Sequence, residues 1–314
     1  MTSSNPVSSP AASFEPHRRR LLGLGYRMLG SMADAEDAVQ EAYLRWHAVD
    51  RDKVSEPKAF LMTTTTRICL DMLTSARARR EEYVGPWLPE PVLDTVALTP
   101  DTRAELAEDL SIALLLTLDR LSPLERAAFL LHDVFDFSFS EVATALQRGE
   151  AACRRLAVRA RANVRATRPR GVTPSPVTSG GVDEKHAKLL SAFTAAVESG
   201  DVNGIAQMLA SDVRVLTDGG GKVRAALKAI QGADRVAQFL VEVTRKRPDA
   251  WWRADFKMRF ALVNGLPGVV IDSRDGPVQT TAFEIEGEAI TAMFVVRNPE
   301  KLRHLAIRRQ ENDR

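Results

Sequence analysis

The sequence predicts two all-α domains, the second with a helix-turn-helix, followed by an α+β domain. Apolar residues recur at helical spacing through residues 14–83 and again through 103–167. Beyond residue 182 the pattern changes to short alternating segments separated by Asn-Gly and Asp-Gly pairs, which are typical of hairpin turns. A chain of 314 residues has room for several such domains.

Stretches rich in Pro, Gly and Ser mark the expected boundaries. Four prolines between Val84 and Pro100 exclude a continuous helix there, and RPRGVTPSPVTSGG from Arg168 to Gly181 is typical of a linker. The predicted division is a disordered tail over 1–13, domains over 14–83 and 103–167 joined by a linker over 84–102, a second linker over 168–181, a domain over 182–305 and a tail over 306–314.

Composition excludes several classes of protein. The chain is 45% hydrophobic and 27% charged, as in ordinary soluble proteins, and its longest apolar run, 112–116, is too short to span a bilayer. No apolar signal segment follows the N-terminus. Cys69 and Cys153 lie far apart and lack neighbours at metal-binding spacing, so we expect a reducing cytoplasm, no membrane, no metal and no cofactor.

The first block is expected to form three helices. The first covers 16–29 and ends at Gly30, the second begins near Ser31, and the third covers 58–80. In the second helix one face is apolar and the other is acidic, with Glu41 and Arg45 at the favourable i,i+4 spacing.

The second block contains two capping boxes. Ser122-Pro-Leu-Glu125 and Ser138-Phe-Ser-Glu141 each place a capping Ser three residues before a Glu. The short helix after Ser138 is interrupted at Gln147-Arg148-Gly149, and a longer basic helix begins at Glu150. A short helix, a tight turn and a longer basic helix form a helix-turn-helix pattern.

The basic helix predicts contact with DNA. Eight arginines lie between Arg148 and Arg170 with Glu150 as the only acid, although the whole chain has a net charge of only +2. Residues near the start of a recognition helix read bases and later ones bind phosphates. The alternative is a solvated basic face on a small helical bundle.

In the last third of the chain, the residue pattern predicts helices over 183–199, 201–210 and 233–245 and a strand over 213–217. Alternating segments follow at 252–263, 267–272, 278–285 and 289–297, so we expect a curved antiparallel sheet. The loop Asp218-Gly-Gly-Gly-Lys222 is not a phosphate-binding P-loop, because Val223 follows the lysine instead of Ser or Thr.

The acidic helix carries a family resemblance. Asp34-Ala-Glu-Asp-Ala-Val-Gln-Glu-Ala-Tyr-Leu-Arg-Trp46 resembles the core-polymerase-binding helix of bacterial extracytoplasmic-function (ECF) sigma factors. Residues 60–81 resemble the family's −10 element region, and residues 121–161 resemble its −35-reading region. The resemblance implies an initiation subunit that binds core RNA polymerase, at its clamp and flap, and promoter DNA.

Candidate site residues follow from the resemblance, position by position. For core polymerase they are Asp34, Asp37, Gln40, Glu41 and Leu44. For the −10 element they are Thr63, Thr64, Thr66, Arg67, Arg77, Arg79 and Arg80. For the −35 element they are Glu150, Ala151, Arg154, Arg155, Arg159, Arg161 and Arg165.

Three further motifs resemble one ECF subgroup. They are Trp87-Leu-Pro-Glu-Pro91, Asp218-Gly-Gly-Gly-Lys222 and Asn298-Pro-Glu-Lys-Leu302. Members of that subgroup have a C-terminal extension similar to SnoaL-like (NTF2-like) cone domains, and the resemblance implies a built-in regulator in place of a separate anti-sigma factor. The candidate regulatory contacts are Trp87, Pro89, Asp218, Gly219, Gly220, Gly221, Lys222, Asn298, Pro299, Lys301 and Leu302.

The C-terminal domain leaves two other functions open. It could make the chain a stand-alone helix-turn-helix regulator that senses a ligand, or a SnoaL-like enzyme fused to a DNA-binding module. Catalysis is not expected, because only His186 and His304 lie in this half and neither pairs with an Asp at an evident spacing. A small-molecule effector in an apolar pocket is the more plausible use, with Trp251, Trp252, Phe256, Phe260 and Phe294 as candidate lining or core residues.

Overall fold

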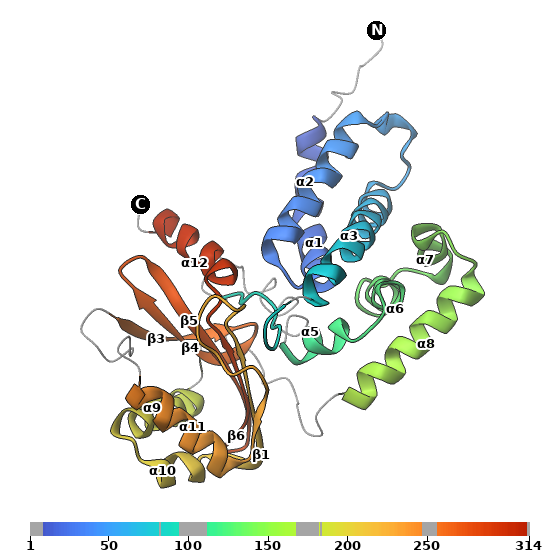
Figure 1. The fold of residues 1–314 in the computed structure, drawn as a ribbon. Coiled ribbons are helices and arrows are strands. Elements are labelled where there is room, and N and C mark those ends of the chain that lie inside the picture. The colour runs from blue at the N-terminus through green and yellow to red at the C-terminus, as the bar shows by residue number, and fades with distance from the viewer. Residues whose placement is uncertain are drawn as a thin grey trace. The chain divides into compact units, whose positions relative to one another are not determined.

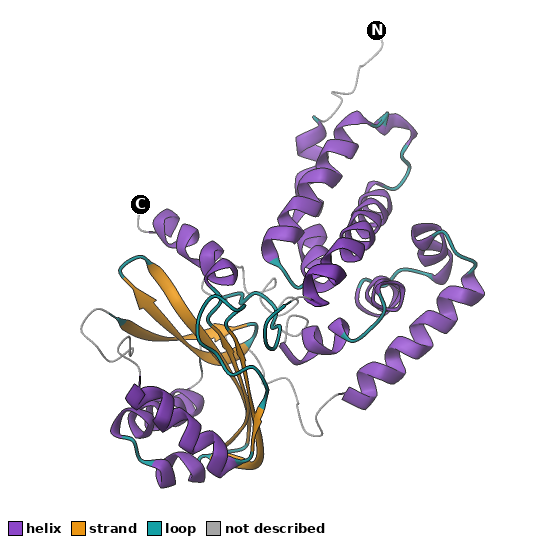
Figure 2. Cartoon of the chain, in the orientation of Figure 1, coloured by secondary structure: helices purple, strands orange, loops and turns teal. Residues whose placement is uncertain are grey.

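The computed structural model describes residues 9–81, 83–93, 112–167, 182, 184–246 and 256–312 (Figures 1 and 2). The chain forms two compact units. The first comprises residues 1–79 and 115–167, and the second comprises residues 80–114 and 168–314. The expected linker between the helical blocks therefore belongs, in its described part, to the same unit as the C-terminal domain.

The first unit is helical throughout its described residues. The element order is α1 (Pro10–Leu29), α2 (Met32–Ala48), the 3₁₀ turn η1 (Arg51–Lys53), α3 (Pro57–Glu81), α5 (Ile112–Asp119), α6 (Pro123–Phe129), the π-turn η2 (Leu130–Val134), α7 (Phe139–Leu146) and α8 (Glu150–Thr167). The ends of α3 and α5 extend into the second unit. All the helices expected here are present.

Side-chain caps fix these helix boundaries as expected. Ser31 accepts a hydrogen bond from the Asp34 N–H, and the capping boxes at Ser122 and Ser138 are complete. The expectation of a disordered tail over 1–13 is wrong for its last residues, because Ser9 caps α1, which begins at Pro10. A proline at the first helical position has no N–H to leave unsatisfied, so it starts a helix well. Residues 1–8 lie outside the described residues.

Buried arginines join the two helical blocks of the first unit. Arg126 is 4% exposed, donates to the carbonyl of Met28 and pairs with Asp119. The Arg27 guanidinium stacks 5.3 Å from the centre of the Phe135 ring. The helices are thus packed into one body around shared polar contacts.

The second unit is an α+β domain with a six-stranded sheet. Its elements are α9 (Glu184–Ser199), α10 (Val202–Gln207), β1 (Leu209–Asp218), β2 (Ile230–Gln231), α11 (Ala233–Lys246), β3 (Lys257–Val263), β4 (Leu266–Ser273), β5 (Gly276–Glu286), β6 (Ala289–Val296) and α12 (Pro299–Asn312). The strand order is β2-β1-β6-β5-β4-β3.

The expectation of a wholly antiparallel sheet is wrong for one pair. Strands β1 and β6 run parallel, with Val215 opposite Met293. The hairpins from β3 to β6 are antiparallel as predicted, but β1 is separated from them by α11, and a pair joined by such a long crossover can be parallel. The local turn signals contain no information about that pairing.

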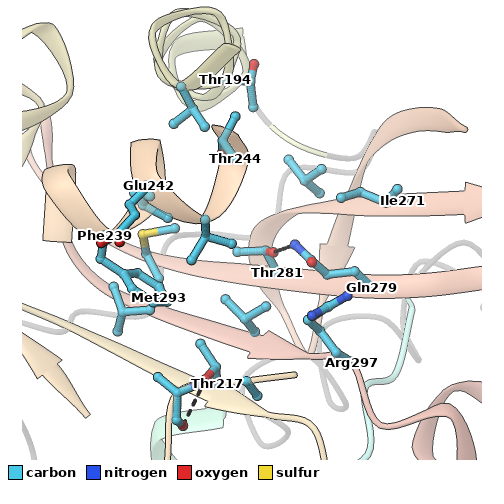
Figure 3. A pocket seen from close by; sticks show the side chains of 18 of the residues that line it. Thr194, Thr217, Phe239, Glu242, Thr244, Ile271, Gln279, Thr281, Met293 and Arg297 are labelled. Atoms are coloured by element: carbon cyan, nitrogen blue, oxygen red, sulfur yellow. Dashed lines mark hydrogen bonds between the residues drawn. The ribbon is translucent and has the colours of Figure 1, made fainter. Parts of the chain in front are cut away.

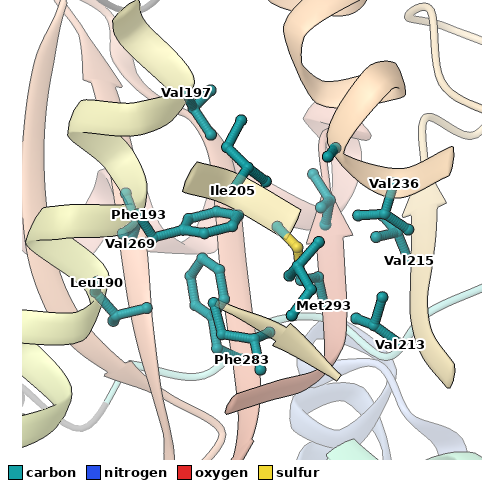
Figure 4. Close-up of a cluster of buried hydrophobic side chains, with 14 of the residues drawn as sticks. Leu190, Phe193, Val197, Ile205, Val213, Val215, Val236, Val269, Phe283 and Met293 are labelled. Carbon is teal, nitrogen blue, oxygen red and sulfur yellow. The ribbon is translucent and has the colours of Figure 1, made fainter. Parts of the chain in front are cut away.

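One face of the sheet packs on α9, α10 and α11 around an apolar core (Figure 4). Phe193 of α9 meets Phe283 of β5 edge-on, with ring centres 5.7 Å apart. Val236 of α11 and Val213 of β1 are fully buried in the same cluster. The three helices therefore cover the concave side that holds the cavity described below.

The opposite face is covered by α12 and by residues 83–93. Phe294 and Val296 of β6 are buried there, although they alternate with the core positions of the strand. The N–H of Asn264 donates to the carbonyl of Val92, and Leu93 forms an isolated bridge with Val263. The expected tail from residue 306 is also wrong, because α12 continues to Asn312. The described part of the expected linker, residues 84–93, therefore belongs to the packing of this domain.

Candidate functional site

The helix-turn-helix of the first unit is formed by α7 and α8. Gln147 ends α7 in the left-handed conformation, with φ of 52°, and its N–H bonds the carbonyl of Ala143. Glycine usually takes this position, because a side chain there is strained. The carbonyl of Gly149 accepts from the N–H of Cys153 at 3.1 Å, which begins α8. The turn thus forms with Gly149 at the N-cap of α8. A Ser at that position would cap the helix more strongly, because its side chain can accept a backbone hydrogen bond.

The exposed face of α8 begins with the residues expected to read bases. Glu150, Ala151, Arg154 and Arg155 are all exposed. Arg154 pairs with Glu150 at 2.9 Å, and its guanidinium lies 5.0 Å from the centre of the Phe139 ring. The Arg154 guanidinium is thus held in place on both sides.

The later arginines of α8 divide into two groups. Arg159 pairs with Glu125 at 2.9 Å, and Arg161 pairs with Asp133 at 2.7 Å. These two guanidinium groups bind the helical bundle in this structure, whereas Arg165 is exposed. Burial by itself would raise the pKa of Glu125. The hydrogen bonds from Ser122 and the charge of Arg159 together outweigh that effect, so the pKa lies below its ordinary value.

The acidic face of α2 is largely exposed, as the polymerase interpretation requires. Asp37, Gln40 and Leu44 are exposed, with Leu44 at 54%, while Asp34 and Glu41 are half-buried. Glu41 pairs with Arg45 at 2.9 Å. The exposed side chains of this face are therefore accessible to a partner protein.

The −10 candidates are not all on the surface. Thr66 is fully buried and donates to the carbonyl of Met62 at 2.8 Å, so its hydroxyl does not face solvent, whereas Thr63 and Thr64 are half-buried. Arg67 donates to the carbonyls of Thr144 and Ala145 at the end of α7, at 2.7 and 3.0 Å. Arg77, Arg79 and Arg80 lie in α3, and their side chains lie outside the described residues.

In the second unit the three motifs of the subgroup meet at one buried carboxylate, that of Asp218. The side chain of Asp218 is 0% exposed. It accepts from the Tyr83 hydroxyl at 2.5 Å, the Leu88 N–H at 2.8 Å and the Lys301 ammonium at 2.8 Å. We call these four residues, with Trp87 and Asn298, the linker clamp. The clamp fixes residues 83–93 to the end of β1 and the start of α12.

Lys301 is the cation of the clamp. Its ammonium also donates to the carbonyl of Leu88 and lies 4.1 Å from the centre of the Trp87 ring. The Tyr83 ring lies 4.8 Å away on another side. Lys301 is 6% exposed, so the ion pair with Asp218 is buried and its charges are satisfied by hydrogen bonds and aromatic faces.

The glycine loop after Asp218 allows the segments to approach closely. Gly220 has φ of +59°, and a Cβ there would lie 2.3 Å from Nδ2 of Asn298. Asn298 donates from Nδ2 to the Tyr83 hydroxyl at 2.9 Å and accepts from the Glu300 N–H at the start of α12. A side chain at Gly220 would therefore be both strained and blocked.

The remaining predicted regulatory residues lie around the clamp. Pro89 and Leu302 are buried, Pro299 begins α12, and Lys222 forms an exposed pair with Glu300. A Cβ at Gly221 would lie 3.1 Å from the Cβ of Val84, and one at Gly219 would meet the carbonyl of Val223. Each motif thus contributes to one arrangement.

Sequence reasoning did not identify Tyr83, whose hydroxyl bridges Asp218 and Asn298. Burial, followed by the hydrogen bond to Asp218, raises the pKa of Tyr83 well above its ordinary value, so the hydroxyl stays a donor. His304 was considered from the sequence only as a possible catalytic group, whereas its Nε2 lies 2.8 Å from the Pro91 carbonyl in the linker. Neither residue has a local pattern, since each depends on a partner far away in the chain.

The concave side of the sheet encloses a cavity of about 430 Å³ (Figure 3). Phe193, Phe239, Phe283 and Met293 contribute to a mostly apolar wall. The aromatic residues suggested by the sequence are not those found, since Phe256, Phe260 and Phe294 do not line the cavity, and Trp251 and Trp252 lie outside the described residues. The polar lining residues are Thr194, Thr217, Arg224, Glu242, Thr244, Lys246, Gln279, Thr281 and Arg297.

The described residues contain neither a candidate membrane span nor a candidate metal site. Within the ranges the structure describes, no helix is both long and apolar enough to cross a membrane. The same part of the chain contains no cluster of His, Cys, Asp and Glu side chains able to hold a metal ion.

Comparison with known families identifies both helical blocks. Residues 14–79 match the family model "Sigma-70 region 2", and residues 111–164 match "Sigma-70, region 4". The chain is 37% identical over 300 residues to the ECF RNA polymerase sigma factor SigJ of Mycobacterium tuberculosis, covering 92% of both proteins. It is 29% identical to the probable ECF sigma factor SigI of the same species, covering 96% of this chain and 97% of SigI.

Among solved structures, the crystal structure of M. tuberculosis SigJ aligns with a TM-score of 0.71 and 34% identity, covering 93% of this chain and 97% of that one. The sigma factor RpoE of Bartonella quintana, solved in complex with the anti-sigma factor NepR, aligns with a TM-score of only 0.37. That likeness is too low to carry an argument, and the expectation that no separate anti-sigma factor acts on this chain has no support from these comparisons.

Proposed function

The chain belongs to the ECF family of RNA polymerase sigma factors, and we propose that its C-terminal domain regulates it by holding the segment between the two sigma regions. Sigma factors of this family bind core polymerase and direct it to promoters. The stand-alone regulator and the fused enzyme are not favoured by the relatives. The proposal therefore concerns how the C-terminal domain controls initiation.

The observation that carries the proposal is the buried Asp218–Lys301 pair. Three segments far apart in the sequence converge on it, one of them from the chain between the sigma regions. Burying two charges costs several kcal/mol, which is regained only when the partners stay in place. The clamp is thus a two-state device: it is satisfied when residues 83–93 are docked, and costly when they leave.

Docking of residues 83–93 limits the reach of the two sigma regions. Those regions bind promoter elements at separate positions along the DNA, so the chain between them must span the distance. Anchoring residues 83–93 removes about 35 Å of extended chain from that span. We infer that the docked state restrains initiation and that release of the linker favours it.

Roles in the first unit follow the same proposal. Asp37, Gln40 and Leu44 form the exposed surface for core polymerase. Glu150, Arg154 and Arg155 read the −35 element, and Arg165 binds phosphate. Arg159 and Arg161 support α8 through Glu125 and Asp133, and so act as positioning residues.

The C-terminal domain acts by binding and not by catalysis in this proposal. His186 and His304 do not line the cavity. Among the described residues that line it, Glu242 is the one carboxylate, and it pairs with Lys246. General acid–base chemistry needs a titrating group held against a substrate, and the described lining offers none besides this paired one.

Transcription from a defined promoter with purified core polymerase tests the proposal. Asp218→Asn keeps the shape of the side chain but removes the charge that Lys301 requires, so we expect initiation to rise roughly five-fold or more. Lys188→Met, which breaks an exposed pair with Glu184 on α9 away from the clamp, is the matched control and should leave initiation unchanged. Equal initiation by Asp218→Asn and the unsubstituted chain, with the linker shown to be released, would refute regulation by the clamp.

A further inference from the structure

The cavity of the C-terminal domain shares its wall with the linker clamp. Thr217 lines the cavity and directly precedes Asp218, and Arg297 lines it and directly precedes Asn298. The N–H groups of Arg297 and Asn298 both donate to the carbonyl of Asp218, at 2.7 and 3.1 Å. The cavity and the clamp therefore lie next to each other at the ends of β1 and β6, where neighbouring residues of the chain belong to one or the other.

A short segment, residues 224–227, connects the cavity to the linker. Thr217 Oγ1 accepts from the Ala226 N–H at 2.7 Å and donates to the Ala226 carbonyl at 3.1 Å (Figure 3). Arg297 Nη1 donates to the carbonyl of Arg224. On its other side this segment meets the linker, because a Cβ at Gly85 would lie 3.6 Å from Cδ2 of Leu227.

The lining of the cavity defines the chemistry of an occupant. Most of the wall is apolar, and the volume of about 430 Å³ suits a small molecule. Gln279 of β5 and Arg297, which directly follows β6, bring N–H donors to one side of the cavity, away from Glu242 (Figure 3). The amide nitrogen of Gln279 already donates one hydrogen bond, to Thr281 Oγ1 at 3.2 Å, and has a second N–H. A molecule that complements this cavity has an apolar body and one carboxylate group, which accepts hydrogen bonds from these donors.

We propose that this cavity binds an apolar carboxylic acid, and that the bound acid releases the linker by taking the Arg297 guanidinium away from the Arg224 carbonyl. Segment 224–227 then loses one of its two side-chain anchors, and Leu227 no longer supports Gly85. The regulatory consequence rests on the clamp function proposed above, whereas binding of the acid does not.

Binding is tested with dodecanoate on the full-length protein by isothermal titration calorimetry. Val243 lines the cavity and is half-buried, so Val243→Trp should fill the space and weaken binding at least ten-fold. Val278→Trp, an equal substitution at an exposed β5 position that does not line the cavity, should bind like the unsubstituted chain. Dodecanol, which lacks the carboxylate, should bind more weakly than dodecanoate. Equal dodecanoate affinity in both tryptophan variants would overturn the site.

Coupling to the clamp is tested by the same titration on Asp218→Asn. Coupling free energies are reciprocal, so a ligand that favours the released linker must bind more tightly where the clamp is already broken. We expect a gain of roughly five-fold or more. Unchanged affinity would reject the coupling while leaving the cavity site standing. Transcription by Asp218→Asn without dodecanoate tests the clamp separately, so failure of one proposal is distinguishable from failure of the other.

Discussion

The two units of the chain place their functional residues in opposite environments. In the first unit, Asp37, Leu44 and Arg155 are exposed on helices whose folding does not depend on them. In the second unit, Asp218 and Lys301 are buried, and their charges are part of the packing. A surface site can lose its charge and keep its fold, whereas a buried pair links its function to local stability.

The largest effect is expected where a surface charge is reversed. Asp37→Arg with Glu41→Arg should abolish holoenzyme formation, because the substitutions turn an attractive surface into a repulsive one. Helical content should stay unchanged and the fold should lose no more than roughly 1 kcal/mol, because Asp37 is exposed and Glu41 gives up only its exposed pair with Arg45. Size-exclusion chromatography with core polymerase measures the binding. Holoenzyme formation at the normal level would remove α2 from the interface.

Next in size is the loss of one partner from the buried pair. Asp218→Ala leaves the Lys301 ammonium without its anion, so the second unit should lose about 3–5 kcal/mol of stability. Lys222→Ala removes an exposed lysine of the same motif and should cost about 0–1 kcal/mol. Denaturant unfolding of both variants gives the two values. Equal losses of unfolding free energy in the two variants would show that the buried pair contributes no more than the exposed one.

A smaller effect is expected in base reading. Arg155→Ala should weaken promoter binding by about 1–3 kcal/mol and relax sequence preference at one position of the −35 element. Arg165→Ala should weaken all promoters alike, because a phosphate contact carries no sequence information. Binding to a library of single-base variants separates the two patterns. Uniform weakening by Arg155→Ala would make that residue a phosphate contact.

The smallest effect concerns pH and the capping box of α7. Hydrogen bonds from Ser138 hold the pKa of Glu141 below its ordinary value of 4.5. A lowered pKa in the folded state means that the charged carboxylate stabilises the fold above about pH 4.5, and that this contribution is lost as pH falls through the folded pKa. Glu141→Gln should thus cost about 0.5–1 kcal/mol at pH 7, and this cost should shrink as the pH falls below 4.5. A cost independent of pH would contradict the charge-based reason.

The first unit could be predicted closely from sequence because its signals are local. Ser31, Ser122 and Ser138 each cap a helix within three residues, and the acidic face of α2 repeats at helical spacing. The errors arose where burial decides. Thr66 is a polar residue in the expected DNA-binding region, but its hydroxyl donates to the Met62 carbonyl of its own helix. Arg67 donates to the Ala145 carbonyl at the end of α7.

The second unit shows the limit of local signals. The motifs around Trp87, Asp218 and Asn298 could be identified, but nothing local indicates that they meet. Their convergence depends on the parallel pairing of β1 with β6, which the hairpin pattern did not predict. Helix α12 was missed for a related reason, since its start at Asn298-Pro299 is also the end of a strand segment.

A reversible lock on the linker gives the most direct test of control by the clamp. A Cβ at Gly221, where φ is +71°, would lie 3.1 Å from the Cβ of Val84, so Val84→Cys with Gly221→Cys can form a disulfide once the two Cβ atoms move apart to the roughly 3.5–4.5 Å that the bond needs. The side chain of Gly221→Cys is strained at this φ, so the single Gly221→Cys variant gives the baseline for the comparison. The native Cys69 and Cys153 are buried, and burial raises the pKa of Cys69 to about 12, so neither competes readily.

Promoter-dependent transcription with core polymerase would compare this variant oxidised and reduced, with each single cysteine variant as a control. Clamp control predicts that oxidation suppresses initiation roughly five-fold or more, that a reductant restores it, and that the single variants do not respond. Equal initiation by the oxidised and reduced double variant would contradict the proposal that linker release controls this sigma factor.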